Sequence, residues 1–286
     1  MNVARRGGSS ILWVLLALGG TPTVHAETPA TARGQLRSPR LYVLDCGRLT
    51  SDSAEEYGLA PNEVADTSMA DPCFLVMHPR GVLLFDTGLP DRLAGHPTKL
   101  EGYGLEVNTP LRAQLAAIGV APADVTYLAL SHSHFDHIGN APDFAGATWI
   151  AQKAELDAVF GPGAREPPPP ELQALAHARK RVIRGDHDVF GDGTVVVKFT
   201  PGHTPGHQSL FLKLAKTGPI VLSGDLYHYP EERSLGIVPG FDVNGEQTKK
   251  SRADLEAFLK KSGAKLWIQH STADNAKLKK APEYYE

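Results

Sequence analysis

Histidine and aspartate occur at close, regular spacing between Ser131 and His137, where the chain reads Ser-His-Ser-His-Phe-Asp-His. In an extended segment alternate side chains share one side, so His132 and His134 can both reach one cation. A turn that begins near Asp136 would direct Asp136 and His137 to a second position close by. The segment therefore predicts two adjacent metal sites.

Each site needs further ligands, and polar residues at the ends of three strand-like runs can supply them. His203 stands in the loop sequence Thr-Pro-Gly-His-Thr-Pro-Gly-His, whose proline and glycine residues fix the direction of the backbone. Asp225 and His270 each follow an apolar run. Imidazole and carboxylate ligands without a thiolate suit a hydrolytic centre that holds two cations, with Zn²⁺ as the first expectation and Mn²⁺, Fe²⁺ and Co²⁺ left open.

The elements that must position these residues are short β-rich runs that alternate with helical patterns. We expect strands over residues 41–44, 74–77, 82–85, 125–130, 195–200, 220–224 and 266–269. Amphipathic spacing predicts helices over 110–118 and 252–260, ended by Gly119 and Gly263. The proline run 167–170 predicts a surface connection that is neither helix nor central strand. Polar residues at strand ends are typical of α/β enzymes, where a rigid sheet holds side chains that a loop leaves exposed.

The chain of 286 residues has the composition of an ordinary globular protein, with 42% hydrophobic residues and a formal net charge of -3. This balance argues against disorder and against a surface for nucleic acid. Residues 1–26 have the pattern of a signal peptide, because two arginines precede the apolar run 11–18 and residues 24–26 offer a cleavage site. That run is too short for a membrane anchor. We therefore expect residues 27–286 to be an exported domain, periplasmic or secreted, without a stable membrane anchor.

Cys46 and Cys73 are the two cysteines of the chain, and each lies beside an apolar strand-like run. In an oxidising compartment they could form a disulfide. Two buried free thiols in adjacent strands would give the same pattern. The sequence gives neither cysteine a catalytic role.

From about Leu41 to its C-terminus, the chain resembles the metallo-β-lactamase-fold superfamily. The resemblance rests on Asp86-Thr-Gly, the His-x-His-x-Asp-His block at 132–137, His203, Asp225 and His270. It implies an α/β (α+β) fold, namely an αββα sandwich in which two mixed β-sheets pack face to face with helices outside.

The resemblance also implies a role for each motif residue. The first metal would be bound by His132, His134 and His203, the second by Asp136, His137 and His270, with Asp225 as a bridge between them. Asp86 would support the ligand loops without binding metal.

Within the superfamily, the segment 41–47 and the motif spacing resemble the N-acyl homoserine lactone lactonases. Those enzymes commonly carry a tyrosine three residues after the bridging aspartate, where this chain has His228, with Tyr227 one position earlier. Either side chain could donate a hydrogen bond to the substrate carbonyl or leaving oxygen, or Tyr227 could simply pack in the wall.

We therefore expect a metal-dependent hydrolase that opens lactone rings, above all N-acyl homoserine lactones, by attack of a hydroxide that bridges two metal ions. Asp136 is a candidate proton shuttle as well as a ligand, and Asp225 is the shared ligand. The alternative is another binuclear-zinc hydrolase that acts on esters, phosphotriesters or β-lactams, and the non-enzymatic alternative is an exported zinc-binding protein.

The expected partner is a small lactone or ester, and the sequence leaves open whether the protein is a monomer or a homodimer. Candidate pocket walls are residues 57–72, the proline-rich connection and residues 227–241, whose apolar side chains would suit an acyl chain. The same segments could instead be loops packed on the sandwich.

Overall fold

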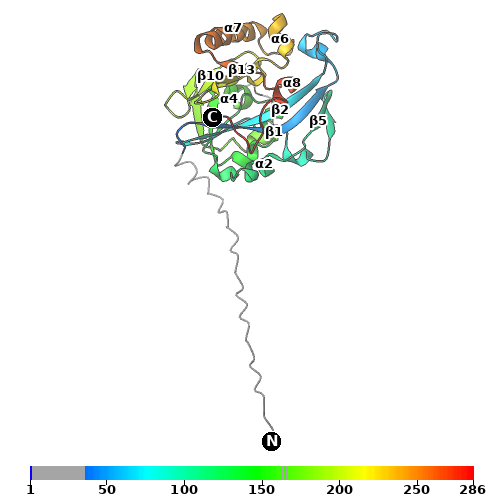
Figure 1. Ribbon diagram of the computed structural model, residues 1–286. Helices are drawn as coiled ribbons and strands as arrows, with labels where there is room; N and C mark the ends of the chain where they lie inside the picture. Colours follow the sequence, from blue (N-terminus) through cyan, green and yellow to red (C-terminus); the bar gives the residue numbers. More distant parts are fainter. Residues whose placement is uncertain (2–35, 163, 165–166) are drawn as a thin grey trace.

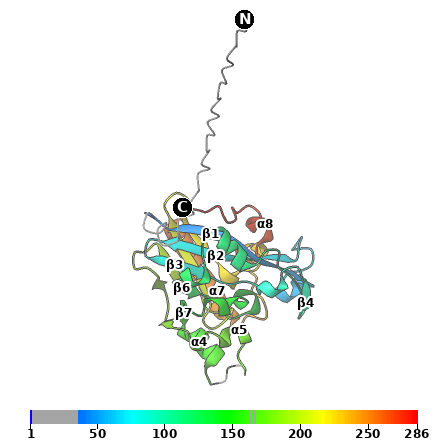
Figure 2. The same ribbon diagram turned by 90° about the horizontal axis from the view of Figure 1, so that it is seen from below.

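Two mixed β-sheets form the centre of the protein. The computed structural model describes residues 1, 36–162, 164 and 167–286. The larger sheet has eight strands in the order β4-β5-β1-β2-β3-β6-β7-β8, and the smaller has five in the order β13-β12-β11-β10-β9. Figure 2 shows β1, β2, β3, β6 and β7 side by side in this order. Pairs β3·β6, β6·β7, β7·β8 and β12·β13 are parallel, so both sheets are mixed.

The strands of the larger sheet are β1 (Arg40–Ser51), β2 (Ser68–His78), β3 (Gly81–Phe85), β4 (Thr98–Leu100), β5 (Tyr103–Glu106), β6 (Tyr127–Ala129), β7 (Thr148–Gln152) and β8 (Lys180–Ile183). The smaller sheet contains β9 (His187–Asp188), β10 (Val195–Phe199), β11 (Gln208–Leu214), β12 (Gly218–Leu222) and β13 (Lys265–Trp267). The helices are α2 (Leu111–Ala117), α3 (Phe135–Ile138), α4 (Lys153–Phe160), α5 (Pro170–Gln173), α6 (Pro230–Leu235), α7 (Gly245–Ser262) and α8 (Thr272–Asn275).

One of the two large apolar clusters lies between the two sheets. Alternation along β1 sends Leu41 and Val43 into this layer, where they join Val197 of β10 and Leu210 of β11. Tyr42, between them in the sequence, belongs to the cluster on the opposite face of the larger sheet. The sheets therefore pack face to face.

Helices cover the outer faces of both sheets. Leu111 and Leu115 of α2 join the outer cluster of the larger sheet, and Leu255 and Leu259 of α7 pack against Val221 of the smaller sheet. Figure 1 shows α7 and α2 on opposite sides of the sheets. The expected αββα sandwich is confirmed.

The expected strands and helices match observed elements, with different bounds. The helix expected over 252–260 is the C-terminal half of α7, which begins after Asn244, whose side chain accepts a hydrogen bond from the backbone N–H of Gln247. The first turns of α7 are polar, so apolar periodicity misses them. Gly263 caps α7 with a left-handed φ of 69°, as expected for a C-terminal glycine.

One expectation about the proline run is wrong. Residues 167–170 were expected to contain no helix, yet α5 begins at Pro170. Proline is tolerated in the first turn of a helix, because the N–H that it lacks would have no partner within the helix.

The expected signal peptide, residues 1–26, lies outside the described residues apart from Met1. Within residues 36–162, 164 and 167–286, no helix is both long and apolar enough to cross a membrane.

Candidate metal centre and active site

The paired ends of β3 and β6 position the histidine-rich segment. The two strands are parallel, with Phe85 beside Ala129, so Asp86 and Ser131 follow at the same edge of the sheet. The backbone N–H of Ser131 donates to Oδ1 of Asp86 at 2.5 Å. Helix α3 then begins after His134 and turns the next side chains in a new direction. The expected turn near Asp136 is therefore this short helix.

The first cluster consists of His132, His134, His203 and Asp225, whose ligand atoms lie within 4.8 Å of one another. Nε2 of His203 lies 3.2 Å from Nε2 of His132 and 3.1 Å from Nδ1 of His134. Oδ2 of Asp225 lies 3.6 Å from Nε2 of both His132 and His203. Three imidazole nitrogens and a carboxylate that converge on one point form a donor set suited to Zn²⁺.

The second cluster consists of Asp136, His137, Asp225 and His270. Oδ1 of Asp225 lies 3.1 Å from Nε2 of His137 and 3.1 Å from Nε2 of His270, and Oδ2 of Asp136 lies 3.6 Å from each of the same nitrogens. Asp225 therefore belongs to both clusters, with one oxygen toward each. The structure brings together all seven residues that the sequence proposes as ligands.

The buried atoms of the second cluster support a cation there. Nε2 of His137 and Oδ1 of Asp225 are buried, and the 3.1 Å contact between them does not have the geometry of a hydrogen bond. Neither atom has a hydrogen-bond partner within the described part of the chain. A buried polar atom without a partner is costly, and a shared cation would satisfy both atoms.

Burial keeps the three histidines of the first cluster uncharged. Burial lowers the pKa of His132 and of His203 well below the ordinary value and lowers the pKa of His134 to about 3. These rings are therefore neutral at neutral pH, which is the form that binds metal.

The two histidines of the second cluster have raised pKa values, in contrast to those of the first cluster. Burial also lowers the pKa of His137, but the carboxylates of Asp225, Asp136 and Asp86 outweigh it and hold the pKa well above its ordinary value. The pKa of His270 is raised by Asp225 against the same burial. The carboxylates around these two rings therefore favour their protonated form.

In four of the cluster histidines, a hydrogen bond at Nδ1 holds the ring so that Nε2 faces the cluster. Nδ1 of His132 contacts Oγ of Ser131, that of His137 contacts Asp86, that of His203 contacts Asp242 and that of His270 contacts the carbonyl oxygen of Ala70, at 2.7 to 3.0 Å. Such contacts fix the tautomer and orientation of a ligating ring. The supporting role expected for Asp86 agrees with its position.

Two glycines let the His203 loop approach its neighbours closely. A Cβ at Gly202 would lie 2.3 Å from the backbone nitrogen of Thr248, and one at Gly206 would lie 2.4 Å from that of Glu155. The carboxylate of Glu155 accepts hydrogen bonds from the N–H of Gly206 and the hydroxyl of Thr204, both at 2.8 Å. The loop is thereby held between α4 and α7.

The clusters open into a pocket of about 400 Å³. Beside the metal-cluster residues, its lining includes five residues from the segments expected to form its walls, namely Tyr57, Met69, Pro169, His228 and Phe241. The sequence did not indicate Leu49, Leu100, Tyr103, Ser133 or Phe135, which also line it. Leu59 and Val64, expected as wall residues, are instead buried in a neighbouring apolar cluster.

The structure separates the two candidates for substrate contact. His228 lines the pocket, with Nε2 3.3 Å from Oδ2 of Asp225 and Nδ1 3.1 Å from Oε1 of Glu232. Burial lowers its pKa, but Glu232 and Asp225 outweigh it and raise the pKa to about 10. Tyr227 does not line the pocket, because its hydroxyl donates to Glu256 at 3.3 Å and its ring packs against Arg252. Of the two, only His228 is placed to contact a substrate in the pocket.

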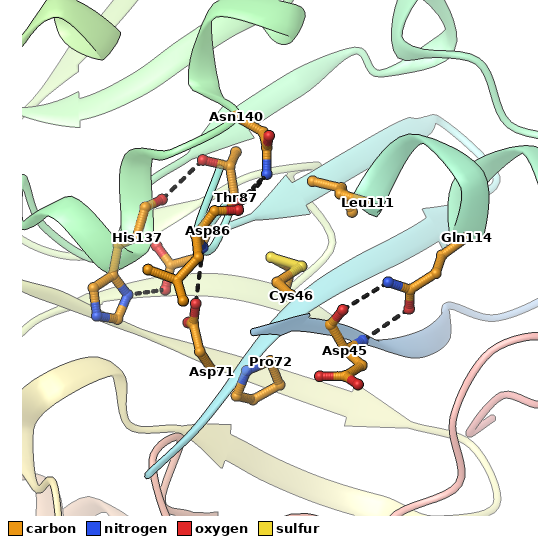
Figure 3. Close-up of a disulfide and its surroundings, with 12 residues drawn as sticks. Asp45, Cys46, Asp71, Pro72, Asp86, Thr87, Leu111, Gln114, His137 and Asn140 are labelled. Carbon is orange, nitrogen blue, oxygen red and sulfur yellow. Dashed lines mark hydrogen bonds and ion pairs between the residues drawn. A yellow bond between two sulfur atoms is a disulfide. The ribbon is translucent and has the colours of Figure 1, made fainter. Parts of the chain in front are cut away.

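A disulfide joins β1 to β2 beside the site. Cys46 and Cys73 are bonded, with their Cα atoms 5.7 Å apart. Figure 3 shows the disulfide near the loop of Asp86 and Thr87, which contacts His137. The alternative of two free thiols is thereby excluded.

Comparison with known proteins agrees with this geometry. The family model described as the metallo-beta-lactamase superfamily matches residues 71–270. N-acyl homoserine lactonase AttM of Azorhizobium caulinodans is 31% identical over 267 residues, covering 86% of this chain and 98% of the relative. N-acyl homoserine lactonase AiiA of Bacillus thuringiensis subsp. kurstaki is 30% identical over 254 residues, with 86% and 98% covered.

Solved structures give the same result. A quorum-quenching N-acyl homoserine lactone hydrolase superposes with a TM-score of 0.75 at 27% identity, covering 87% of this chain and 99% of that one. An N-acyl homoserine lactone hydrolase with the product N-hexanoyl-L-homoserine at its catalytic metal centre gives a TM-score of 0.74 at 27% identity, with 87% and 100% covered. With its fold, its motifs and these relatives in agreement, the chain belongs to the metallo-beta-lactamase superfamily, and its relatives there include proteins named N-acyl homoserine lactonase.

Proposed function

We propose that the protein is a metal-dependent lactonase that hydrolyses N-acyl homoserine lactones. The observation that carries this proposal is the pair of ligand clusters that share Asp225 at the floor of a pocket with apolar walls. The relatives named N-acyl homoserine lactonase support the choice of substrate.

We assign one Zn²⁺ ion to each cluster, with Mn²⁺, Fe²⁺ and Co²⁺ as alternative metals. The neutral imidazoles of the first cluster and the unpartnered buried atoms of the second support this assignment. Divalent cations held there would polarise the ester carbonyl and supply an acidified water for attack.

Groups of the chain itself complete the proposed site. His228 reaches the pocket beside Asp225, and we assign to it the hydrogen bond to the carbonyl or leaving oxygen of the lactone. Asp136 is buried and lines the same pocket, where it can take up and return a proton.

The acyl chain of the substrate would lie against the apolar part of the pocket wall. This part consists of Leu49, Met69, Leu100, Phe135 and Phe241. Leu100 and Phe241 are each 43% exposed, so a bound acyl chain would cover apolar surface that water now contacts.

We further propose that residues 1–26 are removed and that residues 27–286 act outside the cytoplasm, in the periplasm or after secretion. The disulfide supports this compartment, because structural disulfides persist mainly in oxidising surroundings. The proposed partner is a small lactone, with no nucleic acid and no stable membrane anchor.

The test is a substrate panel on zinc-loaded protein. We expect proton release from short- and long-chain N-acyl homoserine lactones with kcat/KM above about 10⁴ M⁻¹s⁻¹. The same preparation should act much more slowly on an aryl ester, a phosphotriester and a β-lactam. Turnover of one of those three with negligible lactone opening would overturn the proposed substrate class and identify the replacement.

A further inference from the structure

His207 is a buried histidine beside the metal clusters that belongs to neither of them. It ends the loop that carries His203, and its side chain is fully shielded from solvent. The centre of its ring lies 5.5 Å from that of His132 and 5.9 Å from that of His203. Its nitrogens are directed elsewhere.

The two ring nitrogens of His207 face partners of opposite kind. Nε2 accepts the backbone N–H of Asp225 at 2.9 Å, so Nε2 carries a lone pair and the ring proton is on Nδ1. Nδ1 lies 3.0 Å from the carbonyl oxygen of Thr200, which accepts that proton. One tautomer of the neutral ring therefore satisfies both partners.

This ring connects two of the three segments that supply ligands to the first cluster, those of His203 and Asp225. Thr200 opens the loop of His203, while Asp225 follows strand β12. Hydroxyl groups connect the same two segments a second time. Oγ1 of Thr200 lies 3.0 Å from Oγ of Ser209, which donates to the carbonyl oxygen of Ser223 at 2.8 Å.

The backbone before Asp225 passes directly against the ring. Gly224 has a φ of +55°, and a Cβ there would lie 2.7 Å from Nε2 of His207. The ring thus limits the position of Asp225 by contact as well as by its hydrogen bond. Since Asp225 belongs to both clusters, a shift of its backbone would disturb both.

We propose that His207 is a positioning residue that holds Asp225 in place for both cations, by accepting its backbone N–H while anchored on Thr200. The inference rests on the proposed metal-dependent function. It assigns to His207 neither a metal nor a substrate contact.

The experiment compares His207→Leu with His207→Gln. Leucine removes both hydrogen bonds, whereas the glutamine amide offers one acceptor and one donor and can replace them. His78→Leu is the matched control, because His78 is also buried and its polar contacts are with Arg80, Thr194 and Asp192, none of which belongs to a metal cluster. Metal-free protein of each variant is titrated with Zn²⁺ in competition with a chromophoric chelator, and its thermal unfolding is recorded.

We expect wild type, H207Q and H78L to bind two cations with similar affinity, and H207L to bind both at least about tenfold more weakly. A loss in H207L but not in H78L, at comparable melting temperatures of the metal-free proteins, separates positioning from a general loss of packing. H207N, too short to reach both partners, replaces H207L if that variant does not fold, with the same expected loss.

Wild-type affinity in a folded H207L or H207N overturns the inference while leaving the lactonase proposal intact. An equal loss in H207L and H207Q overturns it as well, because the hydrogen bonds would then not be responsible. Failure of the wild-type protein to bind Zn²⁺ would instead overturn the proposed function.

Discussion

Oδ2 of Asp86 lies 3.0 Å from Nδ1 of His137, and both side chains are fully buried. Asp86 stands outside both metal clusters, yet this contact directs the other nitrogen of His137 toward Asp225. A carboxylate can only accept, so the neutral ring keeps its proton on Nδ1 and presents the lone pair of Nε2 to a cation.

Replacing Asp86 by asparagine should weaken the second metal site selectively. Asparagine tolerates the left-handed φ of 61° at this position, so the backbone is kept. Turned either way, its amide would place the NH₂ group against a donor, because His137 and Gln269 donate to Oδ2 of Asp86 and the backbone N–H of Ser131 donates to Oδ1. We expect D86N to bind the second Zn²⁺ about 10- to 100-fold more weakly, measured by chelator competition.

The control for this prediction is Asp192→Asn, which alters the separate pair between His78 and Asp192. D192N should bind both cations as the wild type does. Two unchanged affinities in D86N would show that the contact with Asp86 does not tune the site.

His228 and its neighbour Tyr227 should differ sharply in their effect on turnover. His228→Phe removes a polar group that faces the pocket, so kcat on N-hexanoyl homoserine lactone should fall about 100-fold, as for other lost oxyanion contacts. Tyr227→Phe removes a hydroxyl that is bonded to Glu256 away from the pocket, so its kcat should stay near that of the wild type. Steady-state kinetics of the two zinc-loaded variants measure this difference in kcat. A similar loss of kcat in both variants would refute the role assigned to His228.

The two metal sites should respond differently to pH. The raised pKa of His137 means that a cation must displace its proton, whereas the lowered pKa of His134, about 3, leaves that ring already neutral. Affinity of the second site should therefore rise as pH increases toward the pKa of His137, while affinity of the first stays nearly constant above pH 5. Because the pKa of His270 is raised as well, calorimetric titration with Zn²⁺ in buffers of different ionisation enthalpy should detect at least about one more proton released at the second site. Equal proton release at both sites would contradict this difference in charge.

Removing the disulfide should lower stability without removing activity. Cys46 and Cys73 are 27 residues apart in sequence, and loop closure of that length contributes about 3 to 4 kcal/mol to the free energy of unfolding. The double variant C46A/C73A should show this loss in urea unfolding and should no longer respond to a reductant, while still opening lactones when loaded with zinc. A wild-type free energy of unfolding that does not change on reduction would contradict a stabilising role.

The sequence predicted the ligands of this protein better than its pocket. His132 and His134 are recognisable because their spacing has few explanations other than a shared cation, and the strand-end positions of Asp225 and His270 follow from short apolar runs. Phe135 and Leu100 have no such signal, because an apolar side chain that lines a pocket has the same sequence pattern as one in the core.

Supporting residues were harder to predict than ligands. Tyr227 and His228 are adjacent, and only the direction of each side chain in the folded chain shows that His228 faces the pocket and Tyr227 does not. His207 accepts a hydrogen bond from the backbone N–H of Asp225, 18 residues away. Because every residue except proline has a backbone N–H, the residue type of the partner does not reveal such a contact.

In the proposed function, two cations bound through Asp225 are required to open a lactone ring. To test this requirement, Zn²⁺ is added stepwise to metal-free protein, and proton release from N-hexanoyl homoserine lactone is followed at each step. We predict negligible ring opening without metal, full activity once both clusters are filled, and loss of metal and activity together in His134→Ala and Asp225→Asn. Ring opening by the metal-free protein, or full activity in either variant, would contradict the account.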